Sequence, residues 1–238
     1  MYKLNLHAHS NYSDGAHTVS MMAMQYKSLG FPCCVITDHV YSSDAHYSNN
    51  LDKYFKQIEE ADRASKEHDI PVILGAEFSV SRSEECLVFG KNAIISLLLL
   101  RAERQEMDRL DGVITYRDLI DAKKYNPCAV ILCHPMLSET SSGILQLNGH
   151  LALDGFERIN SCNDFFAEER REVPKEFEGL PSFCNSDAHS LFCLNDCYNL
   201  TEEPVTSEEQ LIAYIKNRRP IKHVVFEEPT GLKSLILP

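Results

Sequence analysis

The chain has 238 residues, of which 44% are apolar, and it carries 35 acidic and 23 basic side chains, for a formal net charge of −12. An apolar fraction of this size supports a substantial core and excludes an intrinsically disordered chain. The negative charge excludes a broad basic surface that would bind long nucleic acid, although bound divalent cations would reverse the charge locally.

Cysteine usage and the amino-terminal sequence indicate the compartment. The nine cysteines are an odd number, and Met1 leads directly into an apolar stretch without the pattern of a secretory leader. The longest apolar run, residues 93–100, is far shorter than the roughly 20 residues that cross a bilayer. We expect a soluble cytoplasmic protein without membrane contact, in which thiols such as Cys193 and Cys197 stay reduced.

Apolar runs alternate with helical segments along the chain. Thr18 is the predicted N-cap of a helix that stops at Gly30, and further helices are predicted at residues 51–68 and near 115–125. The predicted strands are residues 4–6, 33–37, 71–75, 86–90, 128–133, 156–160, 181–185 and 221–226. This alternation is typical of a parallel sheet covered by helices, and seven or so units favour a barrel. With no repeat or linker in the sequence, we predict one domain over residues 1–238.

Polar side chains follow six of the predicted strands. In a parallel barrel the carboxyl ends of the strands meet at one mouth, where active sites lie. His7 and His9 point to the same side because alternate residues of a strand share a face. The other polar residues at these ends are Asp38, His39, Glu77, His134, Asn160, Cys162, Asp187 and His189. Such a cluster in a water-poor mouth requires cations between the charges.

The donors are too many for one ion. A zinc ion takes about four protein ligands, whereas the candidate set has eight members: His7, His9, Asp14, His39, Glu77, His134, Asp187 and His189. We therefore expect two or three metals that share a bridging carboxylate. Mixed imidazole and carboxylate donors suit zinc, manganese or iron, and the sequence does not choose among them.

Six motifs carry a family resemblance: HAHSNYSDG, ITDHV, GAEFSV, LCHPM, RINSCN and NSDAH. In this order they resemble the PHP superfamily, named for polymerase and histidinol phosphatase domains. The resemblance covers residues 4–190 and implies a distorted (β/α)7 barrel with a two- or three-metal centre at the carboxyl ends of its strands. Residues 191–238 are expected to complete this barrel or to pack on it.

The resemblance also implies how the donors divide. His7, His9, Glu77 and Asp187 would hold one metal, Glu77 would bridge to a second metal with His134, and Asp14, His39 and His189 would hold a third, with His17 as an alternative donor. Leu87 stands where members of the family often carry another histidine. The second metal is therefore completed by Cys162 or Asn160, binds weakly, or is absent.

Residues and resemblance agree on metal-assisted hydrolysis of a phosphate ester. Two neighbouring cations lower the pKa of a shared water from about 15.7 towards neutrality, which supplies the nucleophile. Asp38 either stabilises the leaving group or orients a ligand histidine. Arg82 and Arg158 are the predicted phosphate contacts, and His46 and Tyr47 are candidates for contacting the leaving group.

Several functions remain open at this point. A free-standing phosphoesterase acting on a small phosphorylated metabolite or nucleotide is the main hypothesis. The alternatives are an exonuclease on short oligonucleotides, a non-catalytic metal-binding module, and metal-dependent hydrolysis of an amide. The oligomeric state has no signal in the sequence.

Overall fold

A computed structural model describes most of the chain, namely residues 1–41, 49–80, 84–107, 113–135, 151–162, 175–217, 222–226 and 234–237. Arg82, His46 and Tyr47 lie outside the described residues. Their predicted substrate contacts therefore stay predictions.

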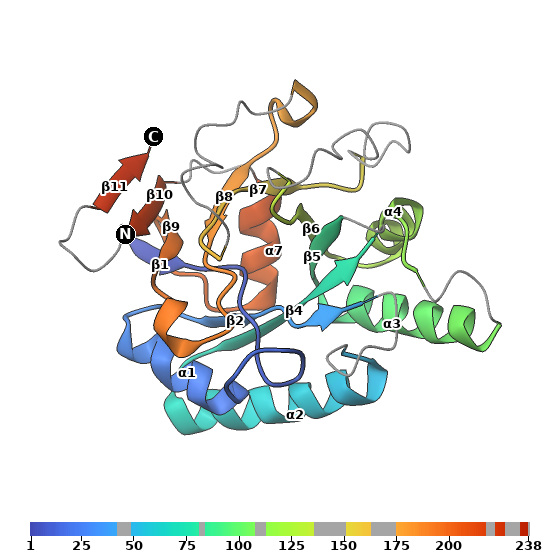
Figure 1. The fold of residues 1–238 in the computed structure, drawn as a ribbon, viewed down its shortest axis with the longest axis horizontal. Helices are drawn as coiled ribbons and strands as arrows, with labels where there is room; N and C mark the ends of the chain where they lie inside the picture. The colour runs from blue at the N-terminus through green and yellow to red at the C-terminus, as the bar shows by residue number, and fades with distance from the viewer. Residues whose placement is uncertain are drawn as a thin grey trace.

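A curled sheet forms the centre of the molecule (Figure 1). Its strands are β2 (Cys34–Ile36), β4 (Val72–Ser79), β5 (Glu85–Phe89), β6 (Ala129–Leu132), β7 (Gly155–Asn160) and β8 (Ser182–Asn185), in this order, and β3 (His39–Val40) pairs with β4. The pairs β2–β4, β6–β7 and β7–β8 are parallel, as the sequence predicts. Glu77 lies within β4 rather than after it, because that strand continues past Gly75.

The prediction of an all-parallel sheet is wrong at β5. This strand runs antiparallel to both β4 and β6. Residues 80–84 separate it from β4, and the Val80 amide donates to the Glu84 carbonyl at 2.9 Å. A parallel neighbour needs a crossover of a dozen or more residues, and the chain has no room for one here. The first residue of β5 therefore lies at the edge where the parallel strands end.

The two faces of the curled sheet pack against different elements. Leu74, Val88 and Val130 belong to the core shared with the outer helices. The alternate positions, including Leu87 and Ile131, belong to a second cluster that includes side chains of α7 (Glu208–Lys216). Because strand residues alternate between faces, Glu77, Glu85 and Leu87 share the side of the sheet that faces away from the outer helices.

The outer helices follow the sequence closely. In α1 (Val19–Ser28) the Thr18 hydroxyl caps the Met21 amide, and Gly30 ends the segment with a φ of +78°. Helix α2 (Leu51–His68) has the predicted bounds and packs beside α1 (Figure 1). Helix α4 (Tyr116–Tyr125) was also predicted, whereas α3 (Lys91–Glu106) was not. Among the described helices, none combines the length and apolar character needed to span a membrane.

A second, smaller sheet lies beside the first. It is antiparallel, with the order β1 (Tyr2–Leu4), β9 (Cys197–Thr201), β10 (Lys222–Phe226) and β11 (Ser234–Leu237). The first predicted strand thus belongs outside the curled sheet. The described residues form a mixed α/β fold with a curled, half-barrel sheet, and they do not give the predicted (β/α)7 count. Short 3₁₀ helices, η3 (Lys175–Phe177) and η4 (Leu191–Cys193), flank β8 along the chain.

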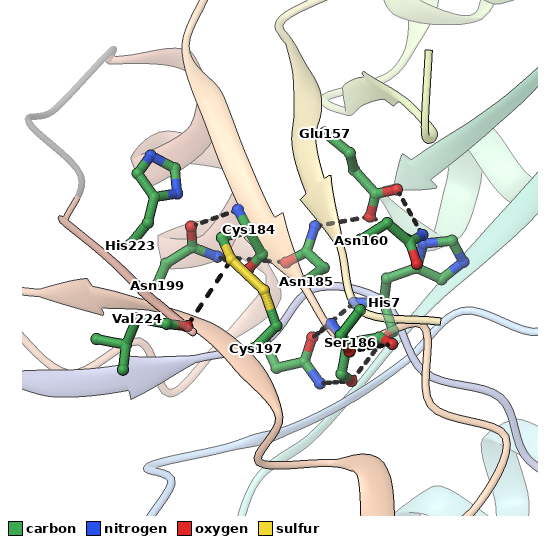
Figure 2. The surroundings of a disulfide bond; sticks show 12 residues. His7, Glu157, Asn160, Cys184, Asn185, Ser186, Cys197, Asn199, His223 and Val224 are labelled. Atoms are coloured by element: carbon green, nitrogen blue, oxygen red, sulfur yellow. Dashed lines mark hydrogen bonds and ion pairs between the residues drawn. A yellow bond between two sulfur atoms is a disulfide. The ribbon is translucent and has the colours of Figure 1, made fainter. Parts of the chain in front are cut away.

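A disulfide joins the two sheets. Cys184 of β8 is bonded to Cys197 of β9, with their Cα atoms 6.0 Å apart (Figure 2). The expectation that all thiols are free is wrong for this pair. The two strands belong to different sheets and are brought side by side only by the tertiary fold, so cysteine spacing carried no signal. Cys193 is a free thiol, as predicted.

Candidate metal centre

The segment that carries His7 and His9 closes the edge of the curled sheet. Ala8 pairs in parallel with Ala188, and the His9 amide donates to the Ala188 carbonyl at 2.9 Å. On the other side the Thr37 amide donates to the Ala8 carbonyl at 2.8 Å. The segment thus lies between the ends of β2 and β8. Its extended backbone sends both imidazoles the same way, with ring centroids 5.0 Å apart.

The deepest donors converge on one point. Asp187 Oδ1 lies 2.9 Å from His9 Nε2 and 3.3 Å from His7 Nε2. Glu77 Oε2 lies 3.2 Å from His7 Nε2 and 3.5 Å from His9 Nε2. Two ligand atoms at about 2.1 Å from a tetrahedral ion are about 3.4 Å apart. The four side chains therefore have the spacing of one coordination shell.

A second group lies on the more open side. Asp14 Oδ1 is 3.3 Å from His189 Nε2, and Asp14 Oδ2 is 3.6 Å from His39 Nε2. His9 Nδ1 also faces Asp14, at 4.0 Å. These four side chains satisfy the geometry of a metal site. Asp14 thus groups with His39 and His189, as the family resemblance implies.

Glu77 lies at the centre of the whole cluster. It is 1% exposed, and imidazoles of four histidines lie within 3.5 Å of its carboxylate: His7, His9, His39 and His134. Neither carboxylate oxygen has a hydrogen bond among the described residues, and the same holds for His7 Nε2 and His39 Nδ1. Buried polar atoms are almost always hydrogen-bonded. These oxygen and nitrogen atoms, which face one another without a hydrogen-bond partner, therefore suit the role of metal ligands.

The charges of the cluster shift its pKa values strongly. Burial opposes ionisation, but neighbouring imidazoles hold the pKa of Glu77 and Asp187 well below the ordinary range. Burial lowers the pKa of His134, and the nearby Glu77 carboxylate outweighs this effect and raises it to about 9. A hydrogen bond with Asp14 raises the pKa of His189 to about 11. Without metal, protons occupy these imidazoles, so metal binding must displace them.

Backbone strain marks two of the predicted ligands. Among the described residues other than glycine, only Asp69, His134 and Asp187 have positive φ, at +49°, +28° and +51°. Asp69 simply ends α2. The other two are held in a disfavoured conformation that costs about 1–3 kcal/mol each and recurs at functional sites.

Glu157 was missed by sequence reasoning, which took Arg158 and Asn160 from the same strand. Glu157 is 1% exposed, its Oε1 lies 2.9 Å from His7 Nδ1, and its Oε2 accepts from the His134 amide at 3.0 Å. Asn160 Nδ2 donates to Glu157 Oε2 and Asp187 Oδ2 at 3.2 and 3.1 Å. Carboxylates commonly orient ligand histidines in this way. The available signal was an acidic residue inside a buried strand.

Glu85 was also missed. Its side chain lies 3.5 Å from His134 Nε2 and 3.9 Å from His39 Nδ1. It begins an antiparallel strand, whereas the sequence argument considered only the residues after parallel strands. Leu87, which replaces an expected histidine, is fully buried in the apolar cluster on the same face.

The structure places several other candidates away from the imidazoles. The hydrogen-bond partners of the buried Asp38 are Ser10, Ser13 and Gln57, and no cluster imidazole is among them in the described part of the chain. Asp38 therefore orders the loop before Asp14 instead of orienting a ligand histidine. His17 belongs to none of the potential metal groups formed by the described residues.

Arg158 lies on the side of the small sheet. It is the extra residue where the pairing of β7 with β8 shifts between Glu157 and Ile159. Its positive charge, together with the larger effect of burial, lowers the pKa of His223 on β10 to about 4. The phosphate contact proposed for Arg158 stays a prediction, and its side chain is near enough to His223 of the small sheet to affect that imidazole.

The remaining candidates for the second metal differ in their contacts. Asn160 uses its amide nitrogen on two carboxylates and its oxygen on the Cys162 amide at 3.0 Å. The Cys162 thiol is hydrogen-bonded to His189, on the open side of the cluster. These contacts join Asn160 to Asp187 and Cys162 to His189.

Comparison with known families bears directly on this cluster. The profile of the PHP domain matches residues 5–172. The chain belongs to the PHP family. A second profile, described as PHP-associated, matches residues 176–220, which include β8, β9 and α7. No curated protein matches the sequence significantly.

Solved structures resemble this PHP protein in fold. A candidate metal-dependent phosphoesterase from Bifidobacterium adolescentis is 18% identical, with a TM-score of 0.55 over 90% of this chain and 95% of its own. An amidohydrolase from Chromobacterium violaceum, with bound sulfate and no metal, is 16% identical, with a TM-score of 0.58 over 91% and 96%. A lesion-specific endonuclease from Pyrococcus furiosus is 18% identical, with a TM-score of 0.60 over 93% of this chain and 57% of its own.

Proposed function

We propose that this PHP protein is a metal-dependent hydrolase that cleaves a phosphate ester of a small metabolite or nucleotide. One observation carries the proposal: the buried Glu77 carboxylate has four imidazoles around it and no hydrogen bond among the described residues. A cluster of this kind has no physical purpose in a merely structural core, because it costs free energy until cations bind.

Divalent zinc, manganese or iron bound in this cluster would lower the pKa of a water molecule and hold a phosphate oxygen. We assign His7, His9 and Asp187 to one metal position, Glu77 to the bridge towards a second position at His134, and Asp14, His39 and His189 to a third. Glu157 positions the deep imidazole of His7 from behind, at 2.9 Å. These roles agree with the distances between the donor atoms and with the motifs of the family.

The substrate is proposed to approach from the side of Asp14 and His189. Their side chains are 30% and 33% exposed, whereas those of His7, His9 and Glu77 are fully buried. Among the described residues, Arg158 is near His223 of the small sheet, and the other predicted phosphate contact, Arg82, lies outside the described residues. The metals would neutralise much of the negative charge of the ester, so we expect hydrolysis to be strictly metal-dependent.

A small substrate fits the charge of the chain. The net charge of −12 disfavours long polyanions, whose binding depends on many lysine and arginine contacts. An exonuclease on short oligonucleotides is the second candidate, and the fold shared with the lesion-specific endonuclease favours it. The amidohydrolase neighbour keeps amide hydrolysis as a third outcome of a substrate screen.

Metal analysis and a substrate screen test the proposal together. Metal-free protein is reconstituted with manganese, zinc or iron(II), its bound metal is quantified, and phosphate monoesters, dinucleotides and amides are assayed. Glu77→Gln keeps the side-chain size and removes the charge, and Glu209→Gln on the exposed face of α7 is its matched control. We expect at least two bound metals and phosphate release in the wild type and the control. Two bound metals without turnover of any phosphate ester would overturn the proposal, and a lack of amide turnover as well would leave a non-catalytic module as the correct description.

A further inference from the structure

The carboxylates of Glu77 and Glu85 face the same imidazole, that of His134. His134 Nε2 is 3.5 Å from Glu77 Oε1 and 3.5 Å from Glu85 Oε2. A charged imidazole bonded to a carboxylate normally lies about 2.7–2.9 Å from it. Both separations are too long for such a bond, and both match the edge of a coordination shell.

Glu85 reaches this place because β5 is antiparallel. It pairs with Ser79, two residues beyond Glu77 on β4, and Leu87 pairs with Glu77 itself. Residues 85 and 87 share a face of the strand. The leucine therefore fills the apolar interior, and the glutamate stands at the edge where the histidines gather. Its side chain is 22% exposed, against 0% for Glu77.

A further contact fixes the orientation of this carboxylate. The Ser79 hydroxyl donates to Glu85 Oε1 at 3.3 Å, and the same oxygen faces His39 Nδ1 at 3.9 Å. Glu85 Oε2 remains directed at His134. His39, Glu77 and Glu85 have the spacing of a metal-holding group, and His134 joins Glu77 and Glu85 through the two 3.5 Å contacts.

We propose that Glu85 supplies a ligand to the second metal, together with His134 and the bridging Glu77, and that this carboxylate replaces the histidine missing at Leu87. The inference rests on the metal centre of the proposed function and adds to it a residue and a metal preference. Carboxylate ligands suit manganese better than zinc relative to imidazole. The position of Glu85 and His134 is therefore a manganese-preferring site, whereas the imidazole-rich group around Asp14 favours zinc.

The test counts metal ions rather than turnover. Metal-free wild type, Glu85→Gln and Glu85→His are titrated with manganese, followed by the electron paramagnetic resonance signal of free ion, and separately with zinc. Glu209→Gln is the charge-matched control, and thermal unfolding verifies that each variant is folded. The wild type and control should bind one equivalent of manganese more tightly than Glu85→Gln by about tenfold or more. Glu85→His should recover zinc at that equivalent and not manganese.

Equal numbers and affinities of both metals in wild type and Glu85→Gln would overturn the inference. So would a Glu85→His variant that leaves the manganese-to-zinc preference unchanged. Failure of the proposed function looks different: metal binding depends on Glu85, and no phosphate ester is cleaved. If Glu85→Gln fails to fold, Glu85→Asp, which retracts the carboxylate by one methylene, must show the same selective loss of manganese.

Discussion

Two polar side chains, equally buried, have opposite surroundings in this molecule. Asn199, in the small sheet, is fully buried, and its amide binds the backbone of Cys184 on both sides, at 2.9 Å each, as well as the Leu4 carbonyl and Asn185 (Figure 2). Glu77, in the curled sheet, is as buried and has no hydrogen bond among the described residues. The satisfied group holds two sheets together, and the unsatisfied one awaits a ligand. In this pair of residues, the buried side chain with hydrogen bonds is structural, and the buried side chain without them is the candidate metal ligand.

Glu77→Gln should produce the largest effect on function and little on folding. We expect phosphate hydrolysis to fall by about 10³-fold, equivalent to about 4 kcal/mol of activation free energy, because the bridging charge is lost. Metal content should fall in the same protein, while the Tm of the metal-free form should not decrease. Metal analysis, steady-state kinetics and calorimetry measure these three quantities. Wild-type activity in the variant would show that Glu77 is not the bridging metal ligand.

Asn199→Ala should lower stability strongly and affect metal binding little. The change leaves the buried amide and carbonyl of Cys184 without partners, and we expect the free energy of unfolding to fall by about 4 kcal/mol. Denaturant titration measures it, with Asn126→Ala at the end of α4 as the control of similar chemistry. The folded fraction should bind the same number of metals as the wild type. A loss of metal without a loss of stability would contradict the comparison.

Reduction of the Cys184–Cys197 bond should destabilise the contact between the sheets. The cysteines are 13 residues apart, and a loop of that length corresponds to about 3 kcal/mol of unfolding free energy in the chain-entropy description. Denaturant titrations of oxidised and reduced protein, and of Cys184→Ser, measure the difference. Cys193→Ser, which alters a free thiol, should behave as wild type. A reductant-insensitive unfolding curve in the wild type would mean that the bond does not form in solution.

Glu157→Gln should weaken metal binding by about 10–100-fold, because the partner that orients His7 loses its charge. If the glutamine oxygen keeps the hydrogen bond from the His134 amide, its nitrogen faces the Asn185 Nδ2 donor, so the free energy of unfolding should also fall by about 1–3 kcal/mol. Isothermal titration with zinc measures the affinity. The matched control is Glu178→Gln, an exposed glutamate on the segment after η3. Equal zinc affinity in Glu157→Gln and wild type would show that Glu157 does not orient His7 for metal binding.

The smallest effect concerns pH and the metal-free protein. The folded-state pKa of His134 is raised to about 9, so its contribution to stability is complete below the unfolded value of about 6.5 and is lost as pH rises through 9. The Tm of chelator-treated protein should therefore fall between pH 7.5 and 10. Saturation with manganese should abolish this slope, since the metal replaces the proton. Parallel slopes with and without metal would contradict it.

The sequence by itself determined helices α1, α2 and α4, most strands and the eight candidate donors, because caps, apolar periods and the motif order are local signals. The α1 cap at Thr18 required no knowledge of the fold beyond these patterns, whereas the extension of β4 through Glu77 was visible only in the structure. It also identified the PHP family through those motifs, and the family profile bears this out.

Only the tertiary structure decided which side chains face one another. The direction of β5 placed Glu85 beside His134, the pairing of β7 placed Arg158 near His223 of the small sheet, and the meeting of β8 with β9 joined Cys184 to Cys197. Strand direction, pairing register and inter-sheet contacts depend on residues far apart in the chain. A local pattern records which groups are present, and the fold decides which of them remain without a partner.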